Sequence, residues 1–136
     1  MTGVLQSGLT PELSVTDFAR SLRFYRDILG FTVAYDRPEA GFGFLVYEGC
    51  NLWLDQIGLG RTWATAPLDP PLGRGVNFER AVSSLDPILK RLGAAKIPLY
   101  LEPETKSYRV AGVDVAQRQF CVQDPDGYLL RFAEIA

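Results

Sequence analysis

Residues 119–132, QFCVQDPDGYLLRF, contain the turn on which the fold prediction rests. At the centre of this stretch, residues 124–127 read Asp-Pro-Asp-Gly, which is a strong β-turn sequence because proline presets φ and glycine accepts positive φ. The flanking residues 118–122 and 128–134 are rich in side chains that favour strands. The sequence therefore predicts a β-hairpin at this end of the chain.

The first half of the chain predicts a strand, a helix and three more strands. Residues 9–16 are extended, and Asp17 can cap a helix because its carboxylate can accept a backbone N–H. One apolar stripe follows at helical spacing, and Gly30 is placed to end the helix. The members of this stripe are Phe18, Leu22, Tyr25 and Leu29. The three predicted strands that follow are residues 31–36, 43–48 and 52–57.

The second half predicts the same order of elements. Residues 75–80 are expected to form a strand, and Ser83 or Ser84 can cap the next helix, which tolerates Pro87 in its first turn. The apolar residues of that helix are Leu85, Ile88, Leu89 and Leu92. Three extended pieces follow: residues 99–102, a stretch within 109–115, and the hairpin of 118–122 with 128–134. Residues 105–107 are predicted to be a polar loop.

The order strand-helix-three strands, or βαβββ, thus occurs twice, which predicts a single α+β domain over residues 1–136. Its first module covers about residues 9–57, its second about residues 74–136, and residues 58–73 link them. The linker contains three of the nine prolines and Trp63. Long connections without clear periodicity are often functional.

Composition excludes several classes of protein. The 136 residues have a net charge of −2, a hydrophobic content of 47% and a charged content of 22%, which are typical of a globular protein. No basic stripe predicts nucleic-acid binding, and no apolar run approaches the roughly 20 residues that span a bilayer. Because no signal peptide is evident, we expect a cytoplasmic protein. Cys50 and Cys121 lack metal-site spacing and are expected to be buried free thiols.

The motifs at the two ends resemble those of one superfamily. Asp17-Phe18, Ser21, Phe24-Tyr25 and Leu29-Gly30-Phe31 are similar to the first helix of the glyoxalase/bleomycin-resistance, or vicinal-oxygen-chelate, superfamily. The hairpin over residues 124–132 resembles its last hairpin. The resemblance implies two βαβββ modules with curved mixed sheets and helices on their outer faces. It also implies a cavity that is completed in a homodimer.

Many members of that superfamily hold a metal ion with four side chains. By resemblance, the matching positions here are about Thr10, Trp53, near Gly75, and Arg131, and none of them is His, Glu or Asp. The chain contains no histidine, and a guanidinium repels a cation. We therefore expect no metal and no cofactor. A hard-cation site made only of Asp and Glu is the alternative.

Within the superfamily, Thr10-Pro11-Glu12-Leu13 and Leu130-Arg131-Phe132 resemble the bleomycin-resistance proteins. The resemblance implies a small homodimer that gives antibiotic resistance by sequestering a glycopeptide drug, or a similar planar or cationic molecule, without metal-dependent catalysis. The sequence departs from that branch before the last hairpin, where Ala116-Gln117 or Val115-Ala116 replaces a common Trp-Gly pair. Alternatives are an atypical lyase, isomerase or transferase, and a small-molecule sensor.

Catalytic patterns are weak in this sequence, so we assign no catalytic residue and expect no enzyme. The absence of histidine excludes Ser-His and Cys-His nucleophiles, and no glycine-rich phosphate-binding motif occurs. Four carboxylates could act as an acid or base if burial raised their pKa. These are Glu12, Glu48, Asp55 and Glu79.

Seven residues are predicted to contact a ligand, and the first group lies in the first module and the linker. Strand alternation places Trp53 and Asp55 opposite Leu52 and Leu54, so that the indole can stack and the carboxylate can pair with a cation. The alternative is that Trp53 fills the core. Phe42 is expected beside a planar group, whereas core packing is preferred for Phe44.

The remaining candidates lie in the linker and the second module. Trp63 is expected over the cavity or at a dimer contact, or else as a hydrophobic plug for its loop. Tyr108 could close over the ligand or be a surface tyrosine. Arg118 and Arg131 could both face the cavity and bind a carboxylate, sulfate or sugar hydroxyl. The alternative for these arginines is salt bridging across the sheet.

Overall fold

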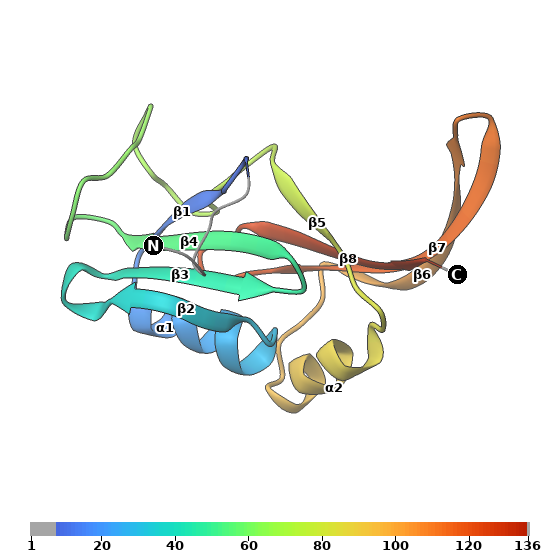
Figure 1. The fold of residues 1–136 in the computed structure, drawn as a ribbon, viewed down its shortest axis with the longest axis horizontal. Helices are drawn as coiled ribbons and strands as arrows, with labels where there is room; N and C mark the ends of the chain where they lie inside the picture. Colours follow the sequence, from blue (N-terminus) through green and yellow to red (C-terminus); the bar gives the residue numbers. More distant parts are fainter. Residues whose placement is uncertain (1–7, 136) are drawn as a thin grey trace. The chain divides into compact units, whose positions relative to one another are not determined.

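The computed structural model describes residues 8–135. The chain divides into two compact units, Met1–Asp69 and Pro70–Ala136. Each unit contains one four-stranded mixed sheet, with the strand order β1-β4-β3-β2 in the first and β5-β8-β7-β6 in the second (Figure 1). The predicted α+β fold of two βαβββ modules is confirmed. Among the described residues, no helix is long and apolar enough to cross a membrane.

In the first unit, β1 pairs with β4 in parallel, and the pairs β2–β3 and β3–β4 are antiparallel. Its elements are β1 (Glu12–Val15), α1 (Phe18–Leu22), the π-helix η1 (Arg23–Ile28), β2 (Thr32–Arg37), the short 3-10 helix η2 (Pro38–Ala40), β3 (Phe42–Tyr47) and β4 (Cys50–Gln56).

The predicted cap of the first helix is confirmed, because Asp17 Oδ1 accepts a hydrogen bond from the backbone N–H of Arg20 at 3.1 Å. Beyond α1 the helix widens, and the Leu29 N–H donates to the Phe24 carbonyl five residues earlier. This wider turn changes the phase of the apolar stripe. Phe24 is buried within this wider turn, and Leu22 from the predicted stripe, which precedes the turn, is only half-buried. Gly30 follows with a positive φ of 91°, as predicted.

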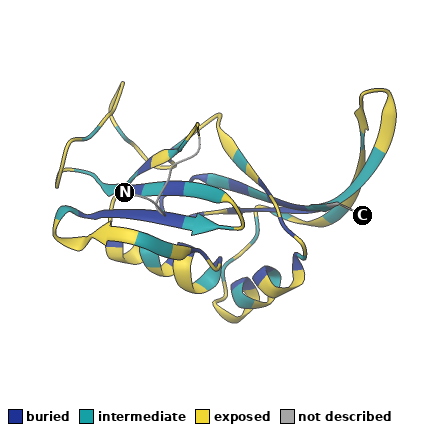
Figure 2. Cartoon of the chain, viewed as in Figure 1, coloured by how far each residue is buried: buried dark blue, intermediate teal, exposed yellow. Residues whose placement is uncertain are grey.

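Close packing holds α1 against its sheet. A Cβ atom on Gly43 would lie 3.0 Å from Cε1 of Phe18, so the strand and the aromatic ring are in direct contact. On this side of the sheet Leu13, Leu45 and Leu54 are buried, and the dark blue of Figure 2 follows β3. The apolar core of the first unit thus lies between α1, η1 and the sheet.

The second unit contains β5 (Asn77–Ala81), α2 (Asp86–Ala94), β6 (Leu101–Val110), β7 (Val113–Gln123) and β8 (Leu129–Ile135). The polar loop predicted at residues 105–107 is wrong, because β6 runs through it and pairs with β7. The strand predicted within residues 109–115 is also wrong, because this stretch contains the turn between β6 and β7 at residues 111–112. Residues 118–122 are part of the longer strand β7. Backbone pairing with a neighbouring strand outweighs the low strand preference of Lys106 and Ser107.

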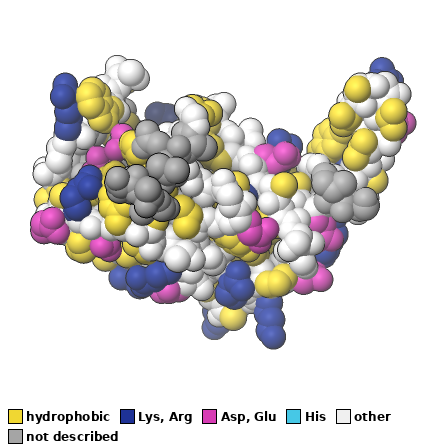
Figure 3. All heavy atoms as spheres, in the orientation of Figure 1, with side chains coloured by type: hydrophobic (Ala, Val, Ile, Leu, Met, Phe, Trp, Pro, Cys, Tyr) yellow, Lys and Arg dark blue, Asp and Glu magenta, His cyan; other side chains and the backbone are white. Residues whose placement is uncertain are grey.

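The hairpin of β6 and β7 extends beyond β8 (Figure 1). The last described β8 residue that pairs with β7 is Ile135, opposite Gln117. Among the described residues, β7 from Ala116 to the turn therefore pairs with β6 alone. Hydrophobic side chains gather along this extension (Figure 3), where Val110 and Val113 are 55% and 63% exposed. An isolated two-stranded ribbon gains little stability of its own.

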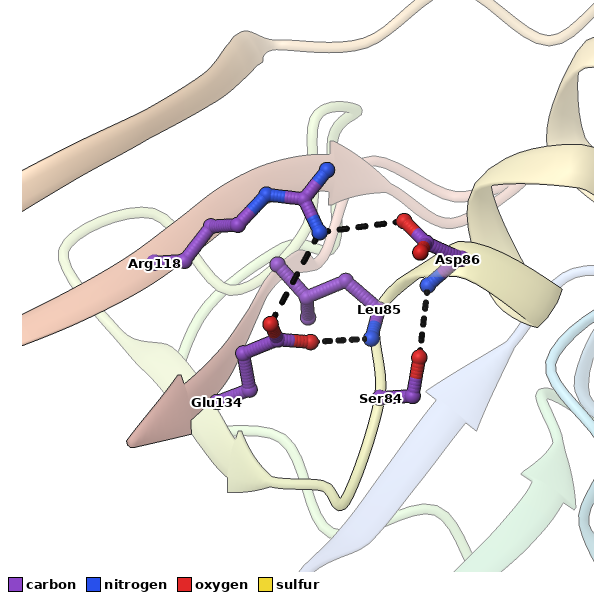
Figure 4. Close-up of polar contacts among 5 residues, drawn as sticks. All are labelled: Ser84, Leu85, Asp86, Arg118 and Glu134. Carbon is purple, nitrogen blue, oxygen red and sulfur yellow. Dashed lines mark hydrogen bonds and ion pairs between the residues drawn. The ribbon is translucent and has the colours of Figure 1, made fainter. Parts of the chain in front are cut away.

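Two side chains, one from the preceding residues and one from β8, accept hydrogen bonds from backbone N–H groups at the start of α2. The cap residue is Leu85 rather than the predicted Ser83 or Ser84, although Ser84 Oγ accepts a hydrogen bond from the Asp86 N–H at 3.3 Å. The Leu85 N–H donates to Glu134 Oε2 at 2.7 Å, which links the helix to β8 (Figure 4). The predicted turn at residues 124–127 is confirmed.

Candidate functional site

The first unit presents a ring-lined surface on the side of its sheet that α1 does not cover. Gly43 contacts Phe18 of α1, and Leu54 is its partner in the strand register. Because side chains alternate across a strand, Trp53 and Asp55 must point to the opposite side. The register places Phe42 beside Asp55, and it places Phe44 beside Trp53.

Four rings form what we call the aromatic face: Tyr35, Phe42, Phe44 and Trp53. The Trp53 ring lies 5.9 Å from that of Phe42 and 6.3 Å from that of Phe44, in edge-to-face arrangements. Tyr35 is 5.3 Å from Phe44. The guanidinium of Arg37 covers Phe42 at 4.2 Å from the ring centre. Phe44, for which core packing was preferred, therefore shares a face with Phe42, and both are buried.

Two buried polar atoms beside these rings have no hydrogen-bond partner within the described part of the chain. They are Nε1 of Trp53 and Oγ1 of Thr10. The Trp53 backbone N–H donates to the Pro11 carbonyl at 2.9 Å, which keeps the segment containing Thr10 next to β4. Buried donors without partners are uncommon and cost free energy, so they call for an explanation.

A pair of carboxyl groups lies at the β1 edge of the same sheet. Burial raises the pKa of Glu12, and the charge of Asp55 and a side-chain hydrogen bond with Asp55 raise it further. The pair can hold a proton between its members or attract a cation. A charged group that binds near this edge would therefore change the pKa of Glu12.

Trp63 lies in the connection between β4 and β5. Its side chain is 65% exposed, and the Arg61 guanidinium stacks on it at 4.1 Å from the ring centre. A side chain with this exposure does not act as the hydrophobic plug that was one of its two predicted roles. Its predicted role at a cavity or dimer contact stays a prediction.

The second unit presents a hydrogen-bonded surface that we call the polar face: Glu79, Glu104, Tyr108, Gln117, Gln119 and Arg131. Arg131 Nη2 lies 3.2 Å from Glu79 Oε1, which also accepts a hydrogen bond from Gln117 Nε2 at 3.3 Å. Gln117 donates in turn to Gln119 Oε1 at 2.9 Å. These side chains lie on one side because they alternate along β5, β7 and β8.

Tyr108 is part of this network. Its hydroxyl oxygen accepts a hydrogen bond of 2.6 Å from Gln119 Nε2, and the same nitrogen donates to Glu104 Oε2 at 2.8 Å. Gln119 is 3% exposed, so its amide is a buried link within the network. Tyr108 itself is half-buried rather than a fully exposed surface tyrosine. Gln117 and Gln119 were not predicted as site residues, although their alternation with Arg118 and Phe120 is evident in the sequence.

Arg118 does not share a face with Arg131, which corrects the expectation that both could face a cavity. Its Nη1 lies 3.0 Å from Asp86 Oδ1 and 3.7 Å from Glu134 Oε1, on the side of the sheet that α2 covers (Figure 4). Arg131 pairs with Cys121, so these two side chains lie on the same side of the sheet. Arg118 is three residues before Cys121 on β7, and alternation along the strand places it on the opposite side. The salt-bridging alternative therefore describes Arg118, and it describes Arg131 as well, because Arg131 forms an ion pair with Glu79 across β8 and β5.

The positions that hold a metal in related proteins do not fit one here. Trp53 has no ligating atom, and Arg131 carries a permanent positive charge that Glu79 neutralises. Within residues 8–135, His, Cys, Asp and Glu form no group of three or more that could hold a metal ion. We derive no metal-dependent step.

The fold agrees with what the sequence matches. The family model described as the Glyoxalase/Bleomycin resistance protein/Dioxygenase superfamily matches residues 9–132, and the chain belongs to this superfamily. No curated protein matches the sequence.

Several solved structures are similar to this chain. TioX from Micromonospora sp. ML1 is 23% identical, with 96% of this chain and 100% of that chain covered and a TM-score of 0.72. Virulence protein STM3117 from Salmonella typhimurium is 18% identical, with 98% and 100% covered and a TM-score of 0.70. A superfamily member from Vibrio splendidus 12B01 is 38% identical, with 92% and 95% covered and a TM-score of 0.42. TioX and STM3117 show the fold alone, and the superfamily assignment rests on the family model.

Proposed function

We propose that the protein binds a planar small molecule and sequesters it without metal-dependent catalysis. The observation that supports this proposal is the aromatic face, where Phe42 and Phe44 pack against Trp53, whose indole N–H has no partner among the described residues. Phe42 and Phe44 are buried, so the rings available to a ligand are the half-buried Trp53 and Tyr35, which is 38% exposed. A flat ring system gains about 1–3 kcal/mol by stacking on such a ring. A hydrogen-bond acceptor on the ligand would satisfy the N–H of Trp53 and fix the orientation of the bound ring.

Bleomycin, or a related glycopeptide, is the ligand that we propose to test first, because its class gives the bleomycin-resistance branch its name. Glu12 and Asp55 at the edge of the aromatic face would attract the cationic part of such a molecule. In this proposal the protein acts in the cytoplasm as a homodimer and confers resistance by lowering the free drug concentration.

The test uses Trp53 as a reporter in a Trp63→Phe variant, which leaves one tryptophan in the chain. Bleomycin added at micromolar concentrations should change the emission of Trp53, because a stacked ring quenches or shifts indole fluorescence. The matched variant Trp53→Phe retains the exposed Trp63 and should show no saturable change. Expression of the protein in a sensitive bacterial strain should also raise the inhibitory drug concentration. Absence of both effects would reject bleomycin as the ligand.

A metal-free lyase, isomerase or transferase is a second candidate, and one observation favours it. The raised pKa of Glu12 beside Asp55 is the arrangement that general acid–base catalysis uses. Turnover of a glyoxalase-type substrate by metal-free protein, lost in Glu12→Gln and retained in Glu39→Gln, would support this function over sequestration. Glu39 is exposed and serves as a matched control.

A further inference from the structure

The polar face of the second unit has hydrogen-bonding groups that the aromatic face does not use. We propose that Arg131 and Tyr108, held by Gln117 and Gln119, recognise a neutral hydrogen-bonding group of a small molecule, such as an amide carbonyl or a sugar hydroxyl, in preference to an anion. This inference deepens the proposed sequestering function and rests on it. It adds Gln117 and Gln119 as positioning residues.

The chemistry of the network fixes the direction of its hydrogen bonds. Gln119 Nε2 lies 2.8 Å from Glu104 Oε2, and an ionised carboxylate can only accept, so this amide must donate there. Gln119 Oε1 is then the acceptor for Gln117 Nε2, whose second hydrogen points to Glu79. Both amide nitrogens thus have all their hydrogens in use. The side chains are held in one orientation without a ligand.

This fixed orientation leaves particular donors available. Because the Tyr108 hydroxyl oxygen accepts from Gln119, the hydroxyl's own hydrogen is directed elsewhere. Arg131 uses Nη2 toward Glu79, while its Nε is buried and has no partner within residues 8–135. A buried donor without an acceptor is destabilising unless something binds to it. An oxygen acceptor on a ligand would satisfy Arg131 Nε.

The charges on this side of the sheet decide which acceptor is preferred. Glu79 and Glu104 are negative, and Arg131 and Lys106 are positive. Lys106 lies opposite Gln117 but is exposed, so solvent screens its charge. Burial raises the pKa of the nearby Cys121 thiol, which therefore stays neutral and adds no charge. Glu79 is itself exposed but forms an ion pair with Arg131 at 3.2 Å, so these two charges cancel. Of the remaining two, Glu104 is half-buried and Lys106 is exposed, so the less screened charge is the negative one of Glu104, which favours a neutral acceptor over a carboxylate or phosphate.

Two small probes that differ in one group test the preference. N-acetylglycinamide is neutral, whereas N-acetylglycine is a carboxylate at pH 7. Each is titrated into ¹⁵N-labelled protein while the Nε–H signal of Arg131 and the side-chain amide signals of Gln117 and Gln119 are followed by NMR. We expect the neutral probe to shift these signals with an affinity about fivefold higher than that of the anion, which corresponds to about 1 kcal/mol. Arg118 and Gln123, which lie outside the polar face, should not shift.

Two variants separate a positioning role from a structural one. Gln119→Glu replaces the donor with acceptors and should abolish the probe-induced shift of Arg131, whereas the matched Gln123→Glu, with the same change in charge on the same strand, should leave it intact. If Gln119→Glu fails to fold, Tyr108→Phe provides the second test. It removes only the hydroxyl and should weaken binding of the neutral probe severalfold.

Three results would overturn the inference: an equal or higher affinity for the anion, equal shifts at Arg118, or no shift with either probe. The bleomycin titration reports on Trp53 in the other unit. Loss of that response with the Arg131 shift preserved would reject sequestration of this drug and leave the polar face as a binding surface. The reverse result would reject the inference alone.

Discussion

Replacing Trp53 by phenylalanine tests whether the protein maintains an indole N–H for a ligand at a cost to its own stability. The N–H is buried and has no acceptor among the described residues. Leaving such a donor without a partner costs about 1–3 kcal/mol. Phenylalanine removes the donor but preserves a ring that can still contact Phe42 and Phe44.

The expected magnitude follows from two opposing terms. The smaller ring buries less apolar area, a loss of about 1 kcal/mol at roughly 25 cal/mol per Å². Removal of the unpaired donor recovers about 1–3 kcal/mol. We therefore expect the free energy of unfolding of Trp53→Phe to lie between no change and an increase of about 2 kcal/mol. Trp53→Leu also removes the donor but loses two aromatic pairs, each contributing about 0.5–1.5 kcal/mol, and should be less stable than Trp53→Phe.

Urea unfolding followed by far-ultraviolet circular dichroism measures both variants without relying on tryptophan emission. Calorimetric titration with bleomycin supplies the complementary result, because Trp53→Phe should weaken binding while leaving stability intact or improved. If Trp53→Phe instead lowers the free energy of unfolding by about 2 kcal/mol or more, the indole N–H has a stabilising partner and the reasoning is refuted.

Other substitutions test the packing and electrostatics of the two units. Gly43→Val should lower the stability of the protein by about 1–3 kcal/mol in urea unfolding, because a Cβ there would meet the Phe18 ring at 3.0 Å, and a near-neutral valine would contradict this packing. Glu134→Ala should cost about 1–2 kcal/mol because the Leu85 N–H loses its acceptor, whereas Glu134→Gln retains an acceptor and should fall within about 0.5 kcal/mol of the native chain in thermal melts. Burial raises the pKa of Glu12 above its ordinary value of 4.5, so the neutral form is favoured in the folded state and wild-type stability should fall as pH rises through that raised pKa. Glu12→Gln should lack this decline and match the wild type below pH 4.5; parallel pH profiles for the two proteins would rule the effect out.

Local signals in the sequence predicted the cap of the first helix, the residue that ends it and the turn of the last hairpin. Asp17 caps the first helix through its own carboxylate, and Gly30 follows the helix with positive φ. In the predicted turn, Asp124 Oδ1 accepts hydrogen bonds from the N–H groups of Asp126 and Tyr128 at 2.9 and 3.0 Å. Each of these features depends on residues that are close together in the chain, which is why the sequence alone sufficed.

The parts that the sequence did not predict depend on distant partners. The residues next to Lys106 in the sequence do not indicate a strand. The strand forms there because its backbone pairs with β7, which comes later in the chain. Arg118 lies on the side of the sheet set by its register position on β7 and by the position of α2. A local sequence pattern gives neither of these. The link between Gln119 and Tyr108 joins residues eleven positions apart across a hairpin whose length was underestimated. Trp53 was predicted on the correct side because alternation within one strand was enough.

The position at which β8 ends affects how the polar face could respond to a bound small molecule. Gln119 pairs with Glu104 of β6 and with Ala133 of β8, whereas Val115, which pairs with Tyr108, has no second strand partner within residues 8–135. Arg131 is therefore anchored in the interior of its sheet, while Tyr108 lies on the first part of a ribbon that can bend. In the proposed binding role, Arg131 would supply a fixed contact and the ribbon that carries Tyr108 an adjustable one, so that small molecules of differing breadth could bind without any change in the core.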